Sequence, residues 1–143
     1  MSLFTGEVVK VADASYCGAY KIQNLVHQVI NLTASSSTTG TFFICPTGFQ
    51  VIAVREIHAV AGGTSAAVQI EHLTGTTAPG SGTAILSATL PLTGAANTLQ
   101  SAPAANIQYP ASVAAAGDRF GYVLTGTLTG LANCCLEVSL ARI

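Results

Sequence analysis

The sequence has few charged residues. Only 5 Lys and Arg and 6 Asp and Glu occur among its 143 residues, so 8% of positions are charged and the formal net charge is -1. This is about a third of the usual share of charged residues. A protein that binds nucleic acid needs a face of Lys and Arg to neutralise phosphates. Five dispersed basic residues cannot form one, so we expect no nucleic-acid partner.

Long apolar runs are also missing. The strongest apolar segment, residues 41–54, is interrupted by Pro46, Gly48 and Gln50. It therefore falls short of the roughly 18 apolar residues that a membrane-spanning helix requires. Residues 1–11 contain Glu7 and lack the apolar core of a signal peptide. We expect no membrane partner, and synthesis in a cytoplasm.

Cysteine is scarce and lacks the spacing of a metal site. The four residues Cys17, Cys45, Cys134 and Cys135 show neither a C-x-x-C pair nor histidines at zinc-finger intervals. We therefore expect four reduced thiols, no bound metal and no cofactor. Adjacent side chains of a strand point to opposite faces, so Cys134 should face the core and Cys135 should face outward.

Groups suited to catalysis are few. The three histidines, His27, His58 and His72, each fall inside an expected strand, and no G-x-S-x-G or H-E-x-x-H motif is present. Hydrogen-bonded positions in a sheet suit these histidines better than catalysis. Glu56 and Glu71 flank apolar strand positions and do not resemble the paired carboxylates of a glycosidase. We expect a protein that is not an enzyme.

Small and β-branched residues are what the sequence has in abundance. Ala, Gly, Ser and Thr occupy 65 of the 143 positions, and helical spacing of apolar residues never persists. Strand-like runs bounded by turn residues recur at intervals of about ten residues. We predict eight strands, at residues 26–33, 41–45, 49–60, 65–73, 83–90, 97–109, 119–127 and 132–142. This pattern predicts an all-β domain over residues 23–143, an eight-stranded antiparallel jelly-roll sandwich.

Alternation predicts which strand residues face the core. In the last run, Leu136 and Val138 share a face with Cys134. In the third run, Arg55 shares a face with Ile57, whereas Glu56 shares a face with Val54. Because an unpaired buried charge is costly, one of these two charges must pair or lie near an edge.

The connections carry uncharged polar tracts. The 46 residues from His72 to Gly117 contain no formal charge. An exposed surface normally carries more charge, so this stretch favours contact with other subunits or a partner protein. We expect a homotrimer. Residues 1–22 hold four of the eleven charges, and they form either a first edge strand or a short N-terminal arm that grips a neighbour.

One turn has a clear signature. Residues 115–120 read AAGDRF, which places Gly117 where a turn can adopt positive φ and Asp118 where its carboxylate can accept backbone amides. An apolar strand follows directly. Gly117 and Asp118 are therefore predicted to form a structural turn at the entry of that strand.

A longer series of motifs resembles the small structural proteins of tailed bacteriophages. The series covers roughly residues 40–142. It comprises Pro46-x-Gly48-x-x-Val51, Gly62-Gly63, Val68-x-Ile70, Leu73-Thr74-Gly75-Thr76-Thr77-Ala78-Pro79-Gly80, Ala96-Asn97-Thr98, Ala116-Gly117-Asp118-Arg119 and Leu124-Thr125-Gly126-Thr127-Leu128-Thr129-Gly130-Leu131-Ala132. The family includes capsid decoration, or cement, proteins and head-fibre-like jelly rolls.

The resemblance implies a trimeric virion protein on the capsid exterior, with the major capsid protein of a phage head as its partner. It would brace the assembled head. In the N-terminal arm, Phe4, Val9, Tyr16 and Tyr20 are the candidate capsid contacts. The alternative is a receptor- or carbohydrate-recognition module resembling a fibre tip. Sugar stacking favours exposed aromatic residues, and the chain has no Trp and only four Tyr.

Overall fold

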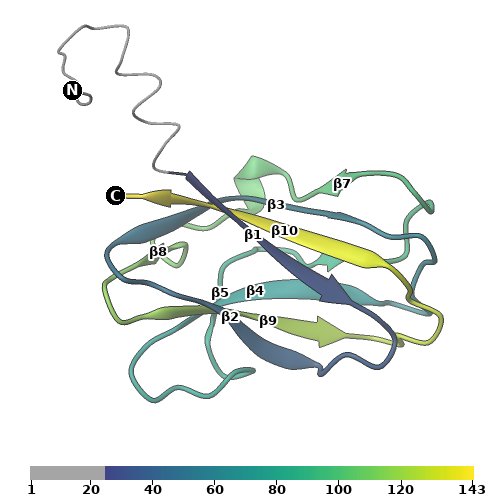
Figure 1. The fold of residues 1–143 in the computed structure, drawn as a ribbon, viewed down its shortest axis with the longest axis horizontal. Helices are drawn as coiled ribbons and strands as arrows, with labels where there is room; N and C mark the ends of the chain where they lie inside the picture. Colours follow the sequence, from purple (N-terminus) through teal and green to yellow (C-terminus); the bar gives the residue numbers. More distant parts are fainter. Residues whose placement is uncertain (1–24) are drawn as a thin grey trace, which may run out of the picture.

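A computed structural model describes residues 25–143 of the chain as two antiparallel sheets packed face to face (Figure 1). The first sheet has the order β1 (Leu25–Leu32), β10 (Cys134–Arg142), β3 (Phe49–Ile57) and β7 (Gln100–Ser101), and β8 (Val113–Ala114) also pairs with β3. The second sheet has the order β2 (Thr39–Ile44), β9 (Arg119–Thr125), β4 (Ala67–Leu73) and β5 (Thr83–Ala84), and β6 (Leu90–Pro91) also pairs with β4. The predicted all-β antiparallel sandwich is confirmed.

The predicted number of eight strands is wrong, because residues 25–143 alone contain ten. The difference lies between residues 83 and 114. There the two long strands expected at 83–90 and 97–109 are replaced by the two-residue strands β5, β6 and β7 and a 3-10 turn, Ala104–Asn106. A proline has no N–H to donate to a neighbouring strand, which fits the end of β6 at Pro91 and the position of Pro103 between β7 and the 3-10 turn. β8 lies in an Ala-rich segment, residues 112–117, that is too short to form a stable helix.

The core lies between the two sheets and follows the predicted alternation. In β10, Cys134, Leu136, Val138 and Leu140 are each at most 1% exposed. Phe120 of β9 is fully buried and faces them from the second sheet. Burying one such side chain contributes about 1.5–3 kcal/mol, so the inner faces supply most of the stability of the sandwich.

Cys134 and Cys135 lie on opposite faces of β10, as alternation predicted. Cys45 and Cys134 are 1% exposed, and Cys135 is partly exposed. All three are free thiols. Burial raises the pKa of Cys45 to about 11 and the pKa of Cys134 to about 12. These two thiols are therefore protonated and unreactive at neutral pH. Cys17 lies outside the described residues.

Within residues 25–143, no helix is long and apolar enough to cross a membrane. In the same range, no cluster of three or more His, Cys, Asp or Glu residues has an arrangement suited to a metal ion.

Candidate interaction surface

One end of the outer face of the second sheet, at Glu71 and Leu73, is covered by the chain's own loop, residues 74–82. Glu71 of β4 is 2% exposed although it lies on this outer face. Its carboxylate accepts one hydrogen bond from the N–H of Gly80 at 2.6 Å and another from the N–H of Gly82 at 2.8 Å. These charge-assisted bonds hold the loop against the sheet and satisfy a buried charge.

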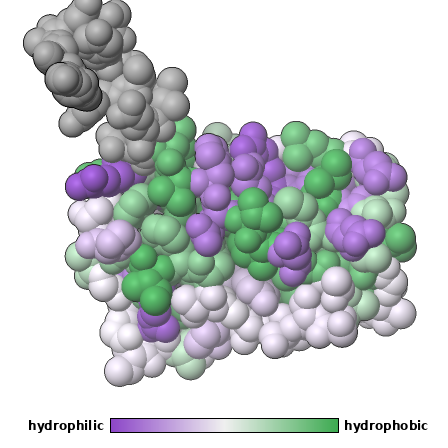
Figure 2. Space-filling view, in the orientation of Figure 1, coloured by the Kyte–Doolittle hydropathy of each residue, from purple (hydrophilic) through white to green (hydrophobic). Residues whose placement is uncertain are grey.

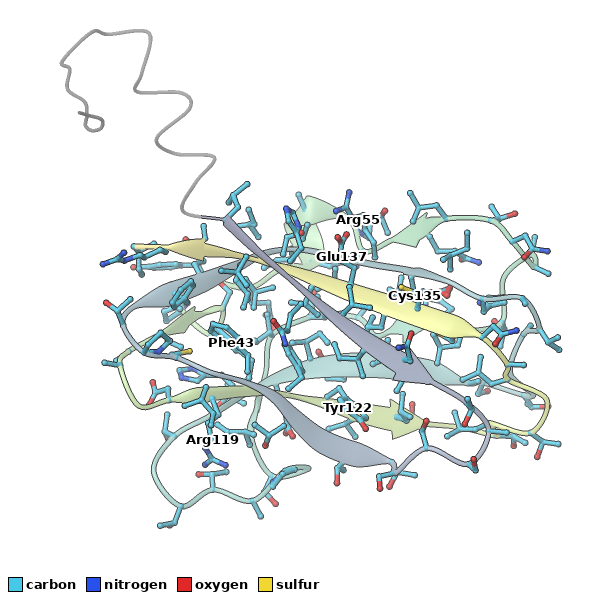
Figure 3. The ribbon with its side chains drawn as sticks, viewed as in Figure 1. Phe43, Arg55, Arg119, Tyr122, Cys135 and Glu137 are labelled. Atoms are coloured by element: carbon cyan, nitrogen blue, oxygen red, sulfur yellow. The ribbon has the colours of Figure 1, made fainter. Side chains whose placement is uncertain are left out.

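The other side of the loop is held by Arg119 of β9, labelled in Figure 3. Its guanidinium donates to the carbonyl oxygens of Gly75 at 2.8 Å and Thr77 at 2.9 Å. A Cβ atom at Gly82 would lie 2.7 Å from the carbonyl oxygen of His72, so the loop can approach β4 this closely only with glycine there. The loop is thus fastened to two neighbouring strands.

The predicted turn before β9 joins the same end of the second sheet. Gly117 has a φ of +90°, and the Asp118 carboxylate accepts a hydrogen bond from the N–H of Ala115 at 3.0 Å. His72 Nε2 donates to the same Asp118 oxygen at 2.9 Å. The hydrogen bond from His72 lowers the pKa of Asp118, and the bond from Ala115 and the positive charge of Arg119 act in the same direction against the effect of burial. Asp118 therefore connects the turn to β4.

The outer face of the first sheet carries exposed apolar side chains instead of a loop. Val29 of β1 is 52% exposed, Ile57 of β3 is 37% exposed, and Leu99 beside β7 is 61% exposed. Together with Cys135, they line a depression of about 240 Å³. In Figure 2, hydrophobic residues lie among hydrophilic ones in the upper half, along the first sheet, whereas the lower half is mostly pale. We call the outer face of this sheet the open face.

An ion pair lies within the open face. Arg55 of β3 and Glu137 of β10 are directly paired in the sheet register, and the Arg55 guanidinium donates to the Glu137 carboxylate (Figure 3). The other oxygen of Glu137 lies 3.5 Å from His27 Nδ1, which is also 2.9 Å from the hydroxyl of Ser139. The charge of Glu137 is therefore compensated by Arg55 of the same sheet.

A second ion pair lies beneath the open face. Glu56 is the penultimate residue of β3 and His58 directly follows the strand, and each is 1% exposed. Nδ1 of His58 lies 2.9 Å from the Glu56 carboxylate, and Nε2 lies 3.1 Å from the carbonyl oxygen of Gly94. Burial lowers the pKa of His58, but the bonds to Glu56 and Gly94 outweigh it, so the pKa is raised. Both ring nitrogens face acceptors, which suits the charged imidazolium.

This buried pair positions the segment that carries Leu99. Besides the contact to Gly94, the carbonyl oxygen of His58 accepts a hydrogen bond from the N–H of Asn97 at 2.7 Å. The segment 94–99 is thereby tied to the end of β3 at two points. The sequence required one of Arg55 and Glu56 to pair or to lie near an edge, and in the structure both residues pair.

The residues singled out from the sequence fall into three groups. Phe4, Val9, Tyr16 and Tyr20 lie outside the described residues. Each of the three histidines forms a side-chain hydrogen bond. Glu56 and Glu71 lie in different sheets, each with its own partners. The open face was not predicted from the sequence. The signal was present, because Val29 and Ile57 are apolar residues at outward positions of the alternating pattern in β1 and β3.

Comparison of the chain with protein-family models, with curated proteins and with solved structures found no match in any of the three.

Proposed function

We propose that the protein is a non-enzymatic structural protein of a tailed-phage virion. It decorates the capsid exterior as a homotrimer, binds the major capsid protein and braces the assembled head. The observation that carries this proposal is that the acidic side chains form hydrogen bonds and ion pairs within the protein. All four in the described part of the chain, Glu56, Glu71, Asp118 and Glu137, bind groups of the protein itself. Such carboxylates fasten strands and loops, as a load-resisting scaffold requires.

The order of the strands supports a jelly roll within the observed sandwich. Successive strands β1, β2, β3 and β4 alternate between the two sheets. The last two strands return to pair with the first two, β10 with β1 and β9 with β2. This nesting of late strands beside early ones is the arrangement expected of a double Greek key. β5 to β8 then correspond to short and interrupted strands at the far edge of each sheet.

A trimer suits the symmetry of a phage head. Local three-fold axes of a capsid present three equivalent copies of the same site. A trimer binds all three at once, so modest contacts combine through a high effective concentration. The low charge of the chain fits this mode of binding, because an apolar and hydrogen-bonded contact does not depend on opposite charges. The protein would be made in the host cytoplasm and added to the completed shell.

The first test is the number of copies per particle. Phage particles purified from the source are quantified by mass spectrometry against the major capsid protein. A decoration protein should be present in hundreds of copies, in a fixed ratio to the capsid protein. A few copies per particle would support the recognition-module alternative, and absence from particles would contradict both.

The second test is the state of the capsid protein that is bound. Stripped heads should bind the purified chain, and unassembled capsid subunits should not, because the site is complete only where several subunits meet. Binding should change little between low and moderate salt. Deleting residues 2–20 should abolish binding if Phe4, Val9, Tyr16 and Tyr20 are the contacts. A truncated protein that still saturates stripped heads would contradict that assignment.

A further inference from the structure

We propose that the open face of the first sheet is the surface through which one copy of this chain packs against a second copy. The inference rests on the proposed function, because it assigns the subunit contact of the trimer. It concerns the outward residues of β1, β10 and β3 together with Leu99.

The chemistry of the open face fits a second copy. Its exposed side chains are the aliphatic Val29, Ile57 and Leu99 beside the polar His27 and Asn31, and the Arg55–Glu137 ion pair among them is already complete. A partner therefore needs no opposite charge to match this surface. A partner with strong charge of either sign would leave its own groups unpaired against Val29, Ile57 and Leu99. Another copy of a chain with 8% charged residues meets this requirement.

The size of the open face is also sufficient. β1 has eight residues, which at about 3.4 Å each give a length of about 27 Å. Four neighbouring strands at about 4.8 Å give a width of about 19 Å. The face therefore offers roughly 500 Å² per copy, or roughly 1,000 Å² for two copies, which reaches the lower limit of specific interfaces. The projecting Leu99 segment adds to this area.

The open face is also held in shape before any partner arrives. The Arg55–Glu137 pair links β3 to β10, and the buried Glu56–His58 pair fixes the segment that carries Leu99. A rigid surface loses less conformational freedom on association than a mobile one. On the second sheet, by contrast, loop 74–82 already lies over the end of the outer face that carries Glu71.

Cys135 provides a reporter within the open face. It lines the depression beside Val29 and Leu99, whereas Cys45 and Cys134 are buried thiols with raised pKa values. In a Cys17→Ser background, a maleimide should therefore react with Cys135 alone. If a second copy covers the open face, the reaction of Cys135 must be slow in the assembly and fast in the monomer.

The experiment measures the rate of Cys135 labelling in the full-length Cys17→Ser protein from high micromolar to nanomolar concentration, with mass by light scattering alongside. We expect the rate to rise by about tenfold or more on dilution, as the mass falls to that of one chain. Leu99→Glu should be monomeric and labelled fast at every concentration. Ile44→Glu is the matched control, because Ile44 is 67% exposed but lies on β2. It should assemble normally.

Each other outcome overturns the inference in a distinguishable way. An assembly in which Cys135 reacts fast would mean that the subunits meet elsewhere, and the trimer proposal would survive. Slow labelling of a monomer would mean that another part of the same chain covers the open face. A monomer with fast labelling at all concentrations would contradict the trimer as well. If stripped heads then protected Cys135, the open face would be a capsid contact.

Discussion

The outer faces of the two sheets place their carboxylates in different environments. On the second sheet, Glu71 is buried and binds two backbone N–H groups of loop 74–82. On the first sheet, Glu137 stays partly exposed and binds Arg55 and His27 side chains. Both carboxylates are satisfied. The bonds of Glu71 hold a loop over the second sheet, whereas the bonds of Glu137 leave the outer face of the first sheet available to a partner.

The outer face of a sheet with little charge can thus either be covered by a loop of the same chain or remain exposed. Leu73 of β4 would be an exposed apolar side chain at an open outer face, and the loop buries it. Glu71 is buried beside it, and the loop N–H groups compensate its charge. Val29 and Ile57 have no covering segment among residues 25–143, and they remain 52% and 37% exposed. Stability should therefore depend strongly on Glu71 and weakly on Glu137, whereas association should depend on the first sheet.

The largest effect is expected for Glu71→Ala. This change removes two charge-assisted hydrogen bonds and leaves the N–H groups of Gly80 and Gly82 without their acceptors. The free energy of unfolding should fall by about 3 kcal/mol, because each such bond contributes about 1.5–3 kcal/mol. Chemical denaturation measures this loss. Limited proteolysis should also cut loop 74–82 faster than in the parent protein, and an unchanged denaturation midpoint would refute the role of Glu71.

An intermediate effect is expected for Asp118→Ala. The carboxylate accepts bonds from the N–H of Ala115 and from His72, so its loss should reduce the free energy of unfolding by about 1–2 kcal/mol. Denaturation of both proteins at neutral pH measures the difference. Equal midpoints and slopes would show that Asp118 is only a solvated loop residue.

The pH dependence of the same variant provides a control. The folded-state pKa of Asp118 is lowered below its usual value of 3.8, chiefly by the hydrogen bond from His72. Its contribution is therefore complete above the unfolded-state pKa and disappears as the pH falls through the lowered, folded-state value. The stability difference between the parent and Asp118→Ala should shrink over that acidic range. If the stability difference between the two proteins persisted below the folded-state pKa, it would not arise from the Asp118 carboxylate.

The smallest effect is expected for Glu137→Gln. The Arg55 and Glu137 side chains are 37% and 28% exposed, and ion pairs at such positions contribute about 0–1 kcal/mol. The free energy of unfolding should therefore fall by less than about 1 kcal/mol. The same denaturation assay as for Glu71→Ala gives a direct comparison of the two faces. A loss as large as that for Glu71→Ala would contradict the distinction drawn between them.

The sequence predicted the long strands well because their side chains alternate. The runs expected at 26–33 and 132–142 correspond closely to β1, Leu25–Leu32, and β10, Cys134–Arg142. It predicted poorly between residues 83 and 114, where small residues and prolines give no periodic signal. There the path of the chain depends on backbone hydrogen bonds to residues distant in the sequence. For example, the N–H of Ile85 donates to the carbonyl oxygen of Ile70.

The sequence by itself determined the all-β class, the inward face of the last strand and the opposite environments of Cys134 and Cys135, because these depend on a two-residue period within one strand. Only the tertiary structure decided that Glu71 binds loop 74–82, that Arg55 pairs with Glu137, and that the first sheet keeps an open face. Those outcomes depend on strand register and on the path of a loop across a sheet. Both are set by contacts between residues far apart in the chain.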